Sequence, residues 1–368
     1  MKKIIIVMLV ILFAGLSLSA DFDYQLDLIS LDPLHKEYFA DRSKPETSLT
    51  YLFFIEGFPD RLIQDKYVSE GNPNYVKVYN FNGKIPGTGK MVRFNLGETI
   101  SLLRNTFTFD SWLSPIALDF SFQPLLSFLF TGKFDDNIGY DGIYFFGGTF
   151  SIADKVSMRI GYHHYCSHYG DAIIKRISTG DRPGTIDDSF WLTYKYVRMN
   201  DLCFGLSIEP FSWLRLYGEY LYPPRNIRSL RPDMFAPNWV ERNGHAINPD
   251  YPDSYNSRIV SLGIELTYAL FPKLGETTIG YDLHMYEEGK VKYDSVNGGP
   301  ITFDEDSPWD IEHTVALEQQ LGSGLSFKMT YHNGRSPSSF LYFMKTSYLS
   351  IGMRFNPDSS LKLFNVGT

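Results

Sequence analysis

The sequence predicts an all-β protein: a single transmembrane antiparallel up-and-down β-barrel of about 12 strands, within a range of 10 to 14. Three observations predict this fold. Apolar and polar residues alternate in segment after segment, the alternating stretches are about nine to eleven residues long, and tight and long connections alternate in the C-terminal half. After residue 20, no apolar run approaches the roughly 20 residues that a membrane-crossing helix needs.

The alternation has the period of two residues that is typical of strands with one polar face. In the stretch 325–332, for example, one face carries Leu325, Phe327, Met329 and Tyr331, and the other carries Ser326, Lys328, Thr330 and His332. A soluble sandwich of two sheets would show the same pattern, so alternation alone leaves both architectures open. Aromatic residues near strand ends favour the membrane barrel, since they match an interfacial girdle: Trp191, Trp213, Tyr220, Tyr222 and Tyr268.

The connections support the barrel further. Residues 271–275 and 322–324 are tight turns, whereas 223–257, 287–309 and 332–344 are long and polar. Short turns on one side and long loops on the other are the outer-membrane pattern. Two consecutive short connections, Asn200-Asp201 and residues 210–213, break this rhythm and make the strand number less certain than the fold.

The ends of the chain have their own expected roles. Residues 1–20 have the basic start, apolar centre and small residues of a cleaved signal peptide. We expect residues 21–48 to be a periplasmic N-terminal segment, residues 49–355 to form the outer-membrane β-barrel, and residues 356–368 to be a C-terminal extension. The expected location is the bacterial outer membrane, with outer-membrane lipids as partners.

Composition excludes several classes of function. The net charge of −8 disfavours a nucleic-acid partner, and two cysteines exclude a disulfide-stapled scaffold. No cofactor motif and no bound metal are predicted, and oligomeric state cannot be derived. The charged residues expected on the lumen face allow two interpretations, an ion-pair network that fills the bore, which we favour, or the lining of a narrow pore: Arg159, Lys195, Arg215, Glu219, Glu265, Asp282, Glu312, Glu318 and Lys328.

The stretch GYHHYCSHYGDA, residues 161–172, concentrates the residue types that carry chemistry. Continuing the alternation of the strand that leads into it places His164 and Cys166 toward the lipid, and Tyr165 and Ser167 toward the lumen. A histidine and a nucleophile two residues apart point the same way from one strand. A third member would come from a neighbouring strand or loop, and Asp187 is the candidate, with Asp181 and Asp188 as alternatives.

At these residues the sequence resembles a bacterial envelope protein family catalogued as domain of unknown function 1207. The run 164–171, HYCSHYGD, is similar to that family's H-x-S-S-H-L-G-D-E signature. Residues 40–45, ADRSKP, and 334–338, GRSPS, are similar to its A-D-P-R-x-P and G-x-S-P-N segments. The departures are Cys166 for the first serine, Tyr169 for leucine and Ala172 for glutamate. The resemblance implies architecture and location, but no activity.

The stretch also resembles the H-x-S-N motif of outer-membrane phospholipase A and lipid A deacylase, whose active strand faces the membrane. This resemblance implies a lipid hydrolase with a His164-x-Cys166 pair, although cysteine departs from those families. Two other interpretations remain: an aromatic girdle with a hydrogen-bonded turn, and a metal site, which the spacing of His164 and His168 disfavours because an extended strand holds them about 13 Å apart. We therefore predict either an envelope barrel with structural or limited transport function, or an outer-leaflet lipid hydrolase.

Overall fold

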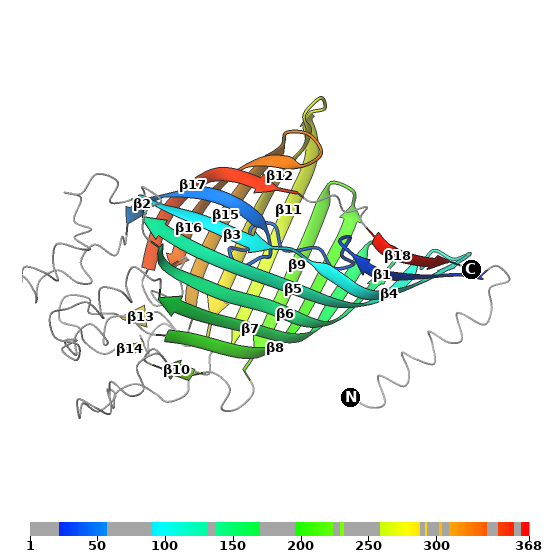
Figure 1. The fold of residues 1–368 in the computed structure, drawn as a ribbon, viewed down its shortest axis with the longest axis horizontal. Helices are drawn as coiled ribbons and strands as arrows, with labels where there is room; N and C mark the ends of the chain where they lie inside the picture. Colours follow the sequence, from blue (N-terminus) through cyan, green and yellow to red (C-terminus); the bar gives the residue numbers. More distant parts are fainter. Residues whose placement is uncertain are drawn as a thin grey trace, which may run out of the picture.

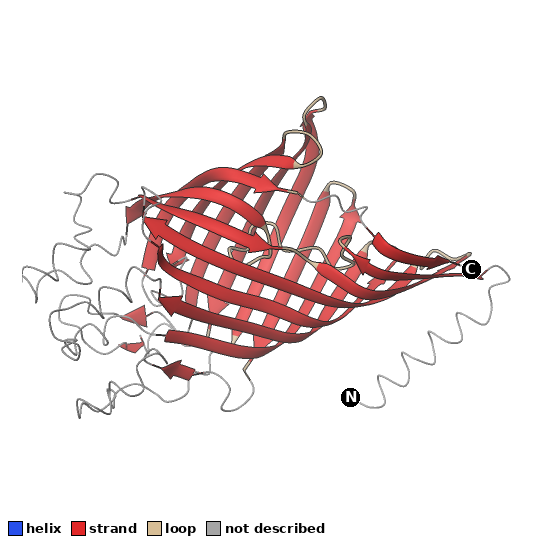
Figure 2. Ribbon diagram, in the orientation of Figure 1, coloured by secondary structure: helices blue, strands red, loops and turns tan. Residues whose placement is uncertain are grey.

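A computed structural model describes residues 22–56, 90–131, 137–169, 196–223, 229–231, 258–287, 291–292, 302–303, 309–336, 345–356 and 362–367. The predicted signal peptide lies outside these residues. Within the described part every regular element is a strand, as Figure 2 shows, and no helix there is long and apolar enough to cross a membrane.

Twelve strands form a closed ring in which every neighbouring pair is antiparallel, so the predicted barrel and its strand number are confirmed (Figure 1). The first and last strands of the ring pair with each other and close it. In chain order the ring consists of β2 (Thr47–Glu56), β3 (Lys90–Gly97), β5 (Ile116–Thr131), β6 (Asn137–Ile152), β7 (Val156–Tyr169), β8 (Tyr196–Phe211), β9 (Leu214–Tyr222), β11 (Ile259–Phe271), β12 (Gly275–Tyr286), β15 (Asp310–Gln320), β16 (Leu325–Arg335) and β17 (Lys345–Phe355).

The prediction that Asn200-Asp201 is a connection is wrong, because both residues lie inside β8, which runs on to Phe211. Polar residues at this point were mistaken for a turn. In the structure Asn200 pairs with His164 and Asp201 pairs with His163, in unbroken register with β7. Tight turns do join β6 to β7 and β8 to β9 at the same end of the barrel, which we call the tight-turn end.

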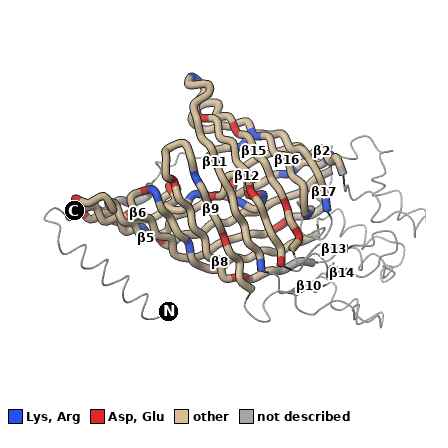
Figure 3. The backbone as a smooth tube through the Cα atoms, turned by 180° about the vertical axis from the view of Figure 1, so that it is seen from behind, with Lys and Arg blue, Asp and Glu red and all other residues tan. Residues whose placement is uncertain are grey.

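The two faces of the barrel wall differ sharply in polarity. The outer face is apolar and exposed, as shown by Ile160, which is 59% exposed, and by Leu202, Phe204, Leu206, Leu262, Ile264, Ile279 and Leu317. The inner face is polar and buried: Arg159, Arg215, Glu219, Glu265, Asp282, Glu312, Glu318 and Lys328 are all at most 8% exposed. Charges of both signs are spread along the barrel strands in Figure 3. An apolar outer band around a polar interior is the architecture of an outer-membrane barrel.

The inward-facing charges are paired, which agrees with the predicted ion-pair network. Arg159 Nε donates to Glu219 Oε2 over 2.7 Å, and Arg215 Nη1 lies 3.1 Å from Glu265 Oε2. Both pairs join neighbouring or next-neighbouring strands of the wall. Lys195 lies outside the described residues.

Residues 35–46, the later part of the segment before the barrel, run inside the lumen, whereas the sequence predicted residues 21–48 on the periplasmic side. We call residues 35–46 the luminal loop. Tyr38, Phe39 and Ala40 are buried there, and the ring of Tyr38 stacks on Tyr217 of β9 at 4.2 Å between centroids. Nothing in the amino-acid pattern of residues 31–38 distinguishes a polar lumen from a polar periplasm, so sequence could not place the loop.

Further strands extend the wall at the tight-turn end (Figure 1). β4 (Ile100–Phe109) continues the line of β3 along the same edge of β5. β1 (Phe22–Ser30) pairs with β4, and β18 (Lys362–Gly367), from the C-terminal extension, pairs with β1. Three short strands complete the described structure: β10 (Ser229–Arg231), which pairs with β8, and β13 (Val291–Lys292) with β14 (Thr302–Phe303).

Candidate functional site

The candidate site is a polar cluster on the outer face of β6, β7 and β8. Register places Gly142 of β6 beside Cys166 of β7, and Asn200 of β8 beside His164. His164 and Cys166 continue the outward row that begins with the exposed Ile160. The chain therefore builds a cluster of imidazole, thiol and amide groups on the outer side of the wall, in which Cys166 is half-buried and His164 and Asn200 are 9% and 3% exposed.

Asn200 fixes the ring of His164. Its Oδ1 lies 2.6 Å from His164 Nδ1, and it also accepts a hydrogen bond from the hydroxyl of Tyr162. Because an amide oxygen only accepts, Nδ1 of His164 carries the proton. The other ring nitrogen, Nε2, then holds a lone pair, which is the state that a general base requires.

The thiol of Cys166 lies between a carbonyl and a second imidazole. Sγ donates to the carbonyl oxygen of Gly142 over 3.4 Å, and Nε2 of His168 lies 3.3 Å from Sγ. Since the single thiol proton points to Gly142, Nε2–H of His168 donates to the sulfur. A donor aimed at the sulfur stabilises negative charge that develops there.

Two tyrosines of β6 hold the imidazoles in place. The ring of Tyr144 stacks on His164 at 4.7 Å between centroids and 24° between planes. Tyr140 stacks on His168 at 4.6 Å and 13°. Alternation accounts for both contacts, because the two tyrosines are four residues apart on β6 and lie opposite two histidines with the same spacing on β7.

The sequence identified only part of this cluster. His164 and Cys166 lie together on the outer face, whereas the proposed third member, Asp187, and its alternatives lie outside the described residues. Asn200 was missed because it was assigned to a turn. The available signal was a polar residue two positions before the outward row Leu202, Phe204 and Leu206.

The inner-facing residues of the same stretch belong to the lumen. Ser167 is fully buried and Tyr165 is 4% exposed, and His163 borders a cavity inside the barrel. Within the described part of the chain, no group of three or more His, Cys, Asp or Glu side chains is arranged to hold a metal ion.

The two cysteines lie on opposite faces of the wall and form no disulfide. Cys203 of β8 is fully buried and lies 3.2 Å from Glu219 Oε2. We expect N-ethylmaleimide to add one label to the folded protein, at the half-buried Cys166, and two labels after unfolding. Mass spectrometry should find one label on folded Cys203→Ala and none on folded Cys166→Ala. A label on Cys203 in the folded protein would contradict the inward orientation of that thiol.

The closed ring, the apolar outer band and the polar interior define the chain as a bacterial outer-membrane β-barrel protein. Among solved structures, it is similar to the outer membrane phospholipase of Salmonella typhi, solved as a dimer with bound calcium, at 12% identity and a TM-score of 0.43 over 85% of this chain and 91% of that chain. It is also similar to outer membrane phospholipase A of Escherichia coli, at 11% identity and a TM-score of 0.44 over 88% of this chain and 99% of that chain.

A third similar structure is the NanC porin, at 10% identity and a TM-score of 0.35 over 72% of this chain and 98% of that chain. Similarity at this level concerns the fold alone. No family model matches the chain, and no curated protein matches it. The resemblance to domain of unknown function 1207 therefore stays a prediction.

Proposed function

We propose that the barrel hydrolyses acyl esters of outer-leaflet lipids, with Cys166 as the nucleophile and His164 as the general base. One observation carries the proposal: on one outward row of β7, the thiol of Cys166 has His168 Nε2 at 3.3 Å, and two residues earlier Asn200 Oδ1 holds His164 Nδ1 at 2.6 Å. Nucleophilic catalysis requires a base that a third group orients and that reaches the nucleophile. In this proposal His164 closes on the thiol when the lipid binds.

The chemistry follows from the assigned protons. His164 Nε2 takes the thiol proton, the sulfur attacks the ester carbonyl carbon, and the carbon–oxygen bond of the ester breaks. The leaving alcohol receives that proton from His164. Water, deprotonated by His164, then attacks the thioester, the carbon–sulfur bond breaks, and fatty acid and the free thiol are released. His168 stabilises the thiolate in the first step.

The height of the cluster supports an outer-leaflet substrate. The tight turn 153–155 precedes β7, and Cys166 lies ten residues beyond the first strand residue, Val156. At roughly 3.3 Å per residue the distance along the strand is about 33 Å. A tilt of about 40° reduces this to about 25 Å along the membrane normal, which is the height of the apolar band. With tight turns in the periplasm, Cys166 lies where the hydrocarbon ends and ester groups begin.

The test is fatty-acid release from labelled phospholipid and from lipid A by the purified protein in mixed micelles. His164→Ala is expected to stop release, because it removes the base. Asn200→Ala should lower release about 100-fold, since a histidine that has lost its orienting partner is displaced from the thiol. Trp112→Ala, at an exposed position outside the cluster, is the matched control and should keep the original rate.

An acyl group on Cys166, found by mass spectrometry after rapid quenching with acid, would identify the intermediate directly. If no lipid ester yields fatty acid or an acylated thiol, the proposal fails. The cluster would then belong to the aromatic girdle that the sequence also allowed.

A further inference from the structure

A second feature of the molecule, independent of the outer-face cluster, is the way in which the luminal loop fills the bore. The loop begins at the tight-turn end, where Lys36 pairs with Glu209 near the β8–β9 turn. It rises to Arg42, which reaches the far ends of β12, β15 and β16. It then returns to the tight-turn end, where Thr47 pairs with Phe355 of β17. The bore is thus occupied along most of its length by a single re-entrant segment.

The tip of the loop is held by charge-assisted hydrogen bonds. Arg42 Nε lies 2.9 Å from Glu312 Oε1. Its Nη1 donates to the carbonyl oxygens of Arg335 and Ser336. The segments ADRSKP, residues 40–45, and GRSPS, residues 334–338, lie far apart in the chain but meet here. Arg42 is the residue that joins them.

The rest of the loop is also held mainly through polar groups. Arg215 donates to the backbone oxygen of Glu37 over 2.7 Å, the backbone NH of Phe39 donates to Glu265 over 2.6 Å, and Lys328 lies 2.8 Å from Glu46. Its apolar contacts are the buried cluster of Phe39, Ala40 and Ala316 and the stack of Tyr38 on Tyr217. A polar interface can exchange its contacts for water, whereas an apolar core cannot.

The inner face of the wall has glycines where the aromatic side chains of the loop lie. A Cβ atom added at Gly205 of β8 would lie 2.5 Å from Tyr38 Oη, and one added at Gly280 of β12 would lie 2.5 Å from Phe39 Cδ1. These glycines leave room for the two aromatic rings, so that the loop packs closely on the wall in the closed state. The wall itself is closed by backbone hydrogen bonds between its strands, which involve no residue of the loop.

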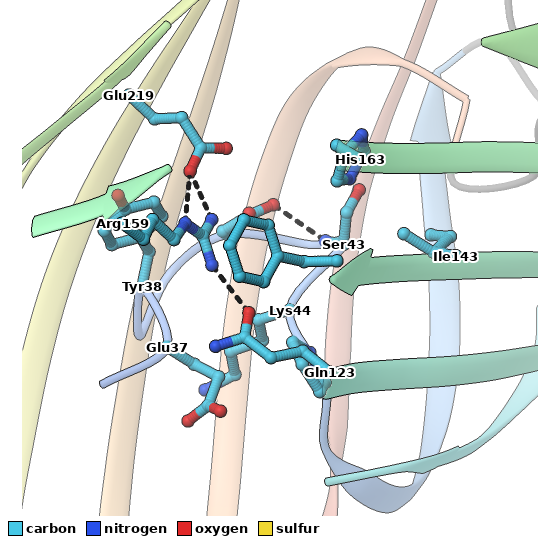
Figure 4. Close-up of a pocket in the computed structure, with 12 residues that line it drawn as sticks. Glu37, Tyr38, Ser43, Lys44, Gln123, Ile143, Arg159, His163 and Glu219 are labelled. Atoms are coloured by element: carbon cyan, nitrogen blue, oxygen red, sulfur yellow. Dashed lines mark hydrogen bonds and ion pairs between the residues drawn. The ribbon is translucent and has the colours of Figure 1, made fainter. Parts of the chain in front are cut away.

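On one side the loop does not fill the bore completely. Between it and β5, β6 and β7 lies a cavity of about 30 Å³, lined by Lys44, Gln123, Arg159, His163 and Glu219 among others (Figure 4). This volume holds one or two water molecules. Nε2 of Gln123, which is 2% exposed, has no protein partner in the described structure and suits such a water. The loop therefore borders a space inside the barrel that is large and polar enough to hold water.

We propose that the luminal loop is a displaceable plug and that the barrel conducts small ions when the plug leaves the bore. Eight strands enclose only side chains and sixteen leave an aqueous channel. Twelve strands with a charged, glycine-spaced inner face leave a water-lined passage once residues 37–44 are removed. This second activity does not depend on the acyl hydrolysis proposed above.

The test is planar-bilayer conductance in potassium chloride, with folding checked by the shift in gel mobility that heating causes in barrel proteins. In one variant a Gly/Ser sequence of equal length replaces residues 37–44, so that β1 and β2 stay connected. The original protein should remain closed, and this variant should show discrete conductance steps. Lys36→Ala is the matched control: its ammonium group pairs with Glu209 at an exposed position, and the bore should stay closed.

Arg42→Ala provides a second measurement that does not depend on the loop replacement. It should raise the open fraction about tenfold or more, because hydrogen bonds of charged groups exceed the roughly 1.4 kcal/mol that corresponds to a factor of ten. A folded loop-replacement variant that stays closed would overturn the proposal. If that variant does not fold, an unchanged open fraction in folded Arg42→Ala overturns it. The proposal is also overturned if the original protein conducts as strongly as the variants.

Discussion

Cys166→Ala is expected to lower fatty-acid release by about 1000-fold or more, which is the scale on which enzymes of this kind depend on their nucleophile. The reason is local. Among the described residues, Cys166 is the nucleophile on the outer face that has both an imidazole donor and a second, oriented imidazole on the same row. Initial rates with labelled phospholipid in micelles would measure the loss.

Cys203→Ala is the matched control, because it also removes one thiol but changes the lumen face. It should leave the rate of release unchanged. Cys166→Ser should retain part of the activity, since a hydroxyl is a weaker nucleophile that the same base can activate. Full activity in Cys166→Ala would remove this residue from the mechanism and would leave the outer-face cluster without a catalytic role.

Arg159→Met is expected to lower the free energy of unfolding by about 3 to 5 kcal/mol, because it leaves a buried carboxylate without its main partner. Arg159 donates to Glu219 and, over 2.7 Å, to Gln123 Oε1. Both charged side chains of the pair are at most 7% exposed. Urea titration of the protein in lipid vesicles, followed by tryptophan fluorescence, would measure the change.

The double variant Arg159→Met/Glu219→Leu separates the cost of an unpaired charge from the value of the pair. Because it removes both charges, it should recover a large part of the stability lost in Arg159→Met. If Arg159→Met alone is as stable as the original protein, water reaches the carboxylate of Glu219. The bore would then be wetter around this pair than the burial of both side chains indicates.

The barrel itself could be predicted from the sequence because its information is local. Alternation along each strand predicts which residues face lipid. The alternation of residues 156–162 continues to His164 and Cys166, so it predicts that both face outward. The side on which these two side chains lie could therefore be predicted without knowing the neighbouring strands. The direction in which these two residues point follows from a period of two, whereas strand length, the aromatic residues near strand ends and the alternation of tight and long connections chose the barrel over a sandwich.

What the sequence could not provide was contact between strands. Asn200 lies 36 positions from His164 in the chain, and only the register of β7 against β8 brings them together. The same limit applies to the luminal loop. Arg42 meets Glu312 and Ser336 through a path across the bore, and no spacing within residues 31–46 encodes that destination.

The pairing of β18 with β1, together with the closure of β2 on β17, has a consequence for how the protein is made. Each of these two pairs joins a strand near the N-terminus to a strand near the C-terminus. Neither pair can form until nearly all of the polypeptide has been delivered to the membrane. Such high contact order slows folding. During that delay the N-terminal strands present open edges, which must be kept from pairing with other chains until the last strand arrives.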